Sequence, residues 1–86
     1  MEKDDKTQAI RTPMQLAMIL QGYRKQRRFS QKQAGEKVGL LPKTISALES
    51  RPERSCIESL FKLISALDLE MVLLSKEKGR TGKGEW

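Results

Sequence analysis

The pattern of apolar and polar residues predicts a first helix that begins after Thr12. Thr12 is a favourable N-cap residue, and Pro13 suits the first position of a helix because its missing N–H needs no partner there. The following residues place apolar side chains every three or four positions, and therefore on one helical face: Leu16, Ile19, Leu20 and Tyr23. The polar residues 1–11 show no such stripe, and we expect them to form a flexible arm.

Residues 30–50 are expected to form two short helices joined by a tight turn. Ser30, with Gln33 three residues later, forms a capping box that marks the start of the second helix. Gly39 is expected to end that helix in a left-handed conformation, and Pro42 to begin the third. The inward positions of both helices are apolar: Ala34, Val38, Leu40, Ile45 and Leu48.

A fourth helix is predicted after a polar connection. Ser55 and Glu58 are spaced as a capping box at its start. Its apolar residues recur at helical spacing: Ile57, Leu60, Phe61, Ile64 and Leu67.

The apolar run Met71, Val72, Leu73 and Leu74 predicts a short strand. The alternative is that these residues extend the fourth helix, but Asp68 interrupts the helical stripe. A lone apolar strand leaves an unpaired edge in water. We therefore expect these four residues to pair with the same strand of a second copy, in a two-fold dimer.

Composition narrows the function classes. The chain has 86 residues, one domain's length, and a net charge of +6, which suits a nucleic-acid partner or serves solubility alone. It has one cysteine, Cys56, and no histidine, so no internal disulfide or zinc site is expected. No catalytic constellation, cofactor motif, signal peptide or membrane-spanning run is apparent, so we expect a cytoplasmic protein that is not an enzyme.

The spacing of small residues in the 30–50 region points to a helix-turn-helix. Gly35 lets the next helix approach closely, and Gly39 makes the turn between the two helices. Basic residues flank the unit. The alternative is a plain helical bundle, because any antiparallel helix pair gives a similar apolar stripe.

Residues 29–50 resemble the helix-turn-helix of the Xre family, the lambda-repressor-like type. The resemblance is carried by Ser30, Gln31, Ala34, Val38, Gly39, Ile45, Leu48 and Glu49. Residues 12–86 as a whole resemble the HipB-like antitoxins, which have four or five helices, one C-terminal strand and a loose tail ending in Trp. The resemblance implies an all-α domain over residues 12–75, with the strand used for dimerisation, and a flexible tail over residues 76–86.

The resemblance also implies that the third helix enters the major groove of operator DNA. Lys43 can donate to guanine, Ser46 can donate or accept, and Ala47 or the Thr44 methyl group can touch a thymine methyl. The alternative is that these are ordinary surface residues. Pro42 stands where the family more often has a polar residue, and Glu49 is interpreted as a structural residue that pairs within the fold. The candidate DNA-binding residues are Ser30, Gln31, Lys32, Gln33, Leu41, Pro42, Lys43, Thr44, Ser46, Ala47 and Arg51.

The tail carries the remaining expectation. Trp86 is the only tryptophan, and the resemblance implies that it docks, with Glu85, onto a HipA-like serine/threonine kinase toxin. The alternative is that Trp86 folds back on the dimer or is exposed. The sequence thus predicts a dimeric repressor that binds palindromic operators, regulates its own operon and acts as an antitoxin. The alternatives are a stand-alone Xre-family regulator without a toxin partner, and an interaction module that has lost DNA binding.

Overall fold

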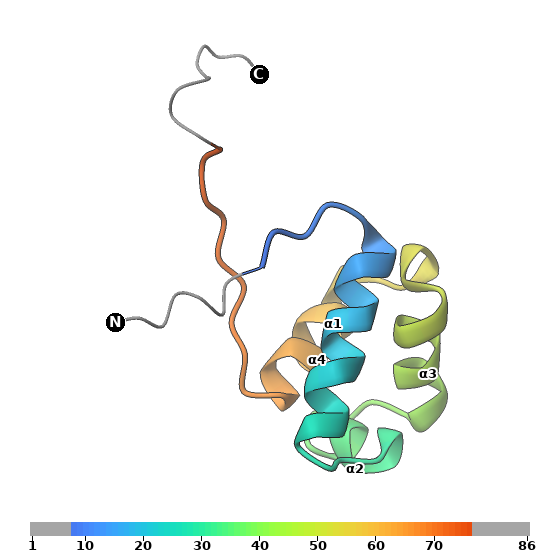
Figure 1. Ribbon diagram of the computed structural model, residues 1–86. Coiled ribbons are helices and arrows are strands. Elements are labelled where there is room, and N and C mark those ends of the chain that lie inside the picture. The colour runs from blue at the N-terminus through green and yellow to red at the C-terminus, as the bar shows by residue number, and fades with distance from the viewer. Residues whose placement is uncertain (1–7, 77–86) are drawn as a thin grey trace.

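The computed structural model describes residues 8–76, and this part of the chain is helical, as predicted (Figure 1). Residues 1–7 of the predicted arm and residues 77–86 of the predicted tail lie outside the described residues. The elements are α1 Pro13–Gln26, α2 Gln31–Glu36, α3 Pro42–Ser50, the short 3-10 helix η2 Pro52–Arg54, and α4 Ile57–Ala66.

Two helices begin with the capping boxes that their sequences favour. The Thr12 hydroxyl accepts from the Gln15 N–H at 3.1 Å, and the Gln15 side chain accepts from the Thr12 N–H. Ser30 and Gln33 exchange the same pair of hydrogen bonds at 3.0 and 2.8 Å, which confirms the predicted start of α2. Each box satisfies backbone donors that have no partner inside the helix.

The predicted cap of α4 is wrong by one residue. The helix begins at Ile57 with Cys56 as its N-cap, and no side chain caps it. Ser55 belongs instead to the end of η2, where its N–H donates to the Pro52 carbonyl at 3.1 Å. The 3-10 turn that Pro52 begins therefore delays the start of α4.

Two helices end at residues in the left-handed region, although neither residue is glycine. Arg28 after α1 and Asp68 after α4 both have φ of 60°. In each case two backbone hydrogen bonds close the last turn, a Schellman motif. After α4, the Asp68 N–H donates to Ser65 at 2.9 Å and the Leu69 N–H to Ile64 at 3.0 Å. This closure ends α4 before residue 69, so the helical alternative for residues 69–75 is wrong.

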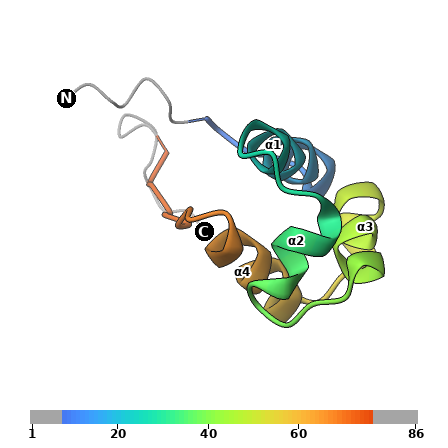
Figure 2. The same ribbon diagram turned by 90° about the horizontal axis from the view of Figure 1, so that it is seen from below.

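The core lies where α1, α2, α3 and α4 meet. Figure 2 shows α2 between α1 and α4, with α3 on the side away from the C-terminal segment. Ile45, Leu63 and Leu67 are the largest fully buried side chains. The other buried members of the core cluster are Leu20, Ala34, Leu48 and Ile64.

Gly35 permits the close approach that shapes the turn between α2 and α3. A Cβ atom at this position would collide with the backbone carbonyl of Leu40. The Leu40 N–H donates to the Gly35 carbonyl at 2.9 Å, and Gly39 between them has φ of 74°. Both glycines are thus required by geometry, Gly35 by space and Gly39 by backbone conformation.

Residues 69–76, here called the C-terminal segment, leave the helical domain after Asp68 (Figure 1). Leu69 packs against the core, but the four residues of the predicted strand are exposed. They form no strand within the described chain. Because a strand needs a partner, their pairing with a second copy stays a prediction. The exposed fractions are 44% for Met71, 63% for Val72, 91% for Leu73 and 73% for Leu74.

Candidate nucleic-acid interface

Helix α3 separates a buried face from a face turned to solvent. Ile45 and Leu48 are 0% and 3% exposed and fill the core. The opposite face is open, with Thr44 half-buried beside it. The exposed residues of this face include Pro42, Lys43, Ser46 and Ala47, all four of which the sequence proposed for DNA contact.

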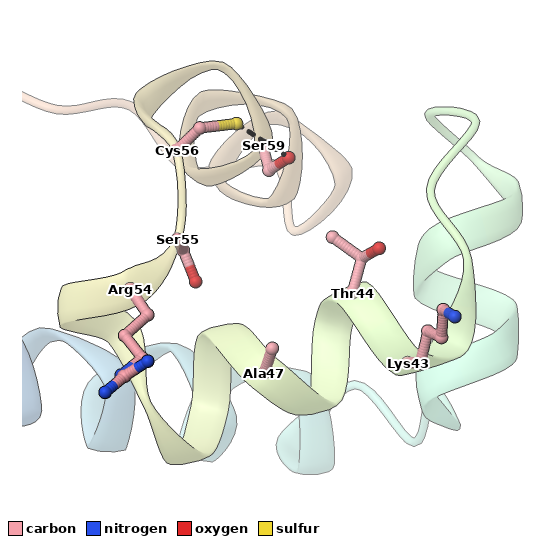
Figure 3. Close-up of a pocket in the computed structure, with 7 residues that line it drawn as sticks. All are labelled: Lys43, Thr44, Ala47, Arg54, Ser55, Cys56 and Ser59. Carbon is pink, nitrogen blue, oxygen red and sulfur yellow. Dashed lines mark hydrogen bonds between the residues drawn. The ribbon is translucent and has the colours of Figure 1, made fainter.

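A shallow hollow of about 530 Å³ lies between α3 and the start of α4. Figure 3 shows Lys43 and Arg54 at opposite ends of the hollow, with Thr44 and Ala47 between them. Two cationic side chains therefore bracket the outward face of α3. The full lining is Lys43, Thr44, Ala47, Arg54, Ser55, Cys56 and Ser59.

The residues of the hollow that come from η2 and α4 were missed by sequence reasoning. Arg54 was visible in the sequence as a basic residue shortly after α3, and that charge was the available signal. Ser55, Cys56 and Ser59 gave no such signal. They reach the hollow because η2 turns the chain and sets the start of α4 beside α3.

Cys56 is an exposed thiol on this surface. Its sulfur lies 3.3 Å from the Ser59 hydroxyl oxygen, and the two share a hydrogen bond (Figure 3). This contact lowers the pKa of the Cys56 thiol from its ordinary value. A lowered pKa makes this thiol more readily deprotonated than an ordinary cysteine.

The candidate residues at the start of α2 have several different roles. Ser30 and Gln33 use their side chains to cap the helix. The Lys32 ammonium lies 3.8 Å from Glu36, in an exposed pair that contributes little to stability. Gln31 is half-buried and donates from Nε2 to Glu49 at 3.1 Å.

Glu49 is the centre of a buried polar cluster, which confirms that it pairs within the fold. Its carboxylate accepts from Arg24 Nε at 2.6 Å and from Arg24 Nη2 at 3.1 Å. Gln21 donates to the same carboxylate at 3.2 Å, and Arg24 Nη1 also donates to the Phe29 carbonyl at 2.7 Å. Burial by itself raises the pKa of Glu49, but the hydrogen bonds from Arg24 and Gln31 and the charge of Arg24 outweigh it, so the pKa is lowered.

The remaining candidates lie at the edges of this surface or elsewhere. Leu41 is 60% exposed at the N-cap of α3, and Arg51 is exposed at its C-cap. The C-terminal segment lies on the far side of the domain from α3 in both views (Figures 1 and 2). The toxin-docking candidates Glu85 and Trp86 lie outside the described residues.

Residues 8–76 offer no grouping of three or more His, Cys, Asp or Glu side chains that could hold a metal ion. Within the same residues, no helix has the length and apolar character needed to cross a membrane. The hollow and the outward face of α3 carry cations, hydroxyl groups, small apolar side chains and the Cys56 thiol. Cations and hydroxyl groups are suited to contacts with phosphates and base edges.

Two known proteins that are similar to this chain in sequence are both HipB antitoxins. The antitoxin HipB of Escherichia coli (strain K12) is 33% identical over 66 residues, which span 77% of this chain and 75% of that protein. HipB of Escherichia coli O6:H1 is also 33% identical over 66 residues, spanning 77% of this chain and 70% of that protein. No protein-family model matches the chain.

Solved structures that contain HipB are also similar to this chain. A chain of a structure described as a HipA–HipB–O2–O3 complex superposes with a TM-score of 0.80 at 31% identity. A chain of a HipB–O4 20mer complex superposes with a TM-score of 0.79, also at 31% identity. Each match covers 83% of this chain and 100% of the other.

Proposed function

The chain belongs to the HipB family of antitoxins, and on that premise we propose that it is a DNA-binding repressor and the antitoxin of a HipA-like serine/threonine kinase. It binds palindromic operators as a dimer and thereby regulates its own operon. It restrains the kinase by binding it and performs no chemistry itself. Residues 12–75 make the contacts with DNA and with the second copy, and residues 76–86 contact the toxin.

The outward face of α3 is the observation that carries the DNA-binding proposal. Lys43 and Ser46 are exposed there and have the donors that base edges require, while Ala47 is small enough to meet a thymine methyl. Arg54 and Lys43 flank this face, and each supplies a charge for the DNA backbone. The related HipB complexes with operator DNA support DNA binding by this chain.

The dimer proposal is supported by the exposure of residues 71–74. A small domain does not usually leave four consecutive apolar side chains in water, and pairing with a second copy would cover them. We expect Leu73→Lys to shift the protein from dimer to monomer in sedimentation velocity, because a charge would enter the shared apolar interface. Lys76→Ala, in the same segment, is the matched control and leaves the dimer intact.

The antitoxin proposal is tested by co-purification with the product of the neighbouring gene. The full chain and a chain stopped before Glu85 are each expressed with that protein. Retention by the full chain and loss on truncation would support docking through Glu85 and Trp86. Retention by both would move the kinase contact onto the helical domain, and retention by neither would favour a stand-alone Xre-family regulator.

A further inference from the structure

The Glu49 carboxylate joins three helices of the domain. Glu49 lies on α3, and its side chain is 4% exposed. Arg24 and Gln21 reach it from α1, whereas Gln31 reaches it as the first residue of α2. The ion pair with Arg24 balances the buried charge, so the bond from Gln31 is not needed for neutrality.

The bond to Gln31 fixes the orientation of an amide at the edge of the candidate interface. A carboxylate accepts hydrogen bonds and cannot donate them, so Glu49 holds the nitrogen of Gln31, and not its oxygen, toward the core. The amide nitrogen has two hydrogens, and one N–H remains after the bond to Glu49. Gln31 is only half-buried, so part of its side chain is open to solvent.

We propose, on the basis of the DNA-binding function above, that Glu49 is a positioning residue for the DNA interface. It holds the Gln31 amide so that the free N–H donates to a phosphate oxygen of the DNA backbone. The reversed amide would present its oxygen to the phosphate and repel it. Since Glu49 belongs to α3, the same carboxylate ties this phosphate contact to the placement of the helix that faces the bases.

The double variant Arg24→Met/Glu49→Met separates positioning from stability. It removes the buried ion pair, keeps the net charge and fills the space with side chains of similar length, a replacement that buried ion pairs often tolerate. The probe is a fluorescein-labelled duplex of random sequence, because a phosphate contact does not depend on base sequence. We expect a melting temperature close to wild type and an affinity about tenfold weaker, the loss typical of one hydrogen bond to a charged group.

Two single variants complete the experiment. Gln31→Leu removes the proposed phosphate donor and is expected to weaken binding about tenfold, whereas Gln21→Leu removes a comparable bond to Glu49 from α1 and leaves binding unchanged. The triple variant with Gln31→Leu should bind no more weakly than Arg24→Met/Glu49→Met, because both changes remove the same contact.

Three outcomes would overturn the positioning role. They are wild-type affinity in a folded Arg24→Met/Glu49→Met protein, additive losses in the triple variant, and equal effects of Gln21→Leu and Gln31→Leu. The comparison of Gln21→Leu with Gln31→Leu can be made even if the double variant does not fold. Failure of the DNA-binding function itself is distinguishable, because the wild-type protein would then show no salt-dependent binding to the duplex.

Discussion

The helix-turn-helix unit, residues 30–51, and the C-terminal segment place their aliphatic side chains in opposite environments. In the first, Ile45 and Leu48 are buried and most polar residues face solvent, although the Glu49 side chain is only 4% exposed. In the second, Leu73 is 91% exposed and Leu74 is 73% exposed. Both regions contain aliphatic residues, so residue type alone does not predict which of these side chains are buried.

The difference shows which apolar surfaces are covered within a single chain and which are left exposed. The helix-turn-helix unit has its apolar partners within the same chain, since α1 and α4 cover it. Apart from Leu69, the C-terminal segment has no such cover among the described residues. An apolar run in this state is expected to find its partner in another molecule, which is why we place dimerisation there and DNA contact on α3.

The largest effect is expected from truncating the core of the helix-turn-helix unit. Ile45→Ala should lower the free energy of unfolding by about 2–5 kcal/mol, because Ile45 is fully buried and its removal leaves a cavity. Leu73→Ala, measured by urea denaturation at a concentration where the protein is monomeric, should change it by less than about 0.5 kcal/mol. Comparable losses at both positions would contradict the contrast between the two regions.

A smaller but specific effect is expected at the turn between α2 and α3. Gly35→Ala should cost about 1–3 kcal/mol of stability, since the added methyl group collides with the backbone of Leu40. Gly22→Ala is the matched control, because Gly22 is helical and a Cβ atom there meets nothing within 4 Å. Thermal denaturation should show the control equal to or above wild type. If Gly35→Ala left the stability unchanged, the backbone of the turn would be able to move away from the added methyl group.

The smallest expected effect is the pH dependence that Glu49 adds to the helix-turn-helix unit. Its pKa is lowered in the folded state, so its contribution to stability is complete above the unfolded pKa of about 4.3 and is lost as pH falls through the folded pKa. Acid titrations of unfolding free energy should fall more steeply for wild type than for Arg24→Met/Glu49→Met. If the curves of unfolding free energy against pH were parallel for the two proteins, Glu49 would not contribute to the loss of stability in acid.

The parts of the fold that depend on residues close together in the sequence were predictable. Ser30 and Gln33 form the predicted capping box because both partners lie within one helical turn. The left-handed conformation of Arg28 and Asp68 was not predicted, because glycine is the usual signal for it and neither residue is glycine. Ser55 was misassigned because the 3-10 turn from Pro52 uses its backbone N–H.

The candidate interface was predictable only where it follows one helix. The outward residues of α3 follow from helical spacing once Ile45 and Leu48 are assigned to the core. The partner of Glu49 did not follow from sequence, because Arg24 lies 25 positions away on another helix. Arg54 and Cys56 join the hollow through the packing of η2 and α4 beside α3, and residue types do not reveal such packing.

The most direct measurement compares Lys43→Ala with Lys76→Ala in binding to DNA from upstream of the gene, across a range of salt concentrations. Both variants lose one positive charge, but Lys43 lies on α3 and Lys76 at the end of the C-terminal segment. We expect Lys43→Ala to weaken binding by about 1–3 kcal/mol and Lys76→Ala to leave it near wild type, with affinity falling steeply as salt rises. Equal effects of the two variants, or a flat salt response, would contradict DNA binding through the face of α3.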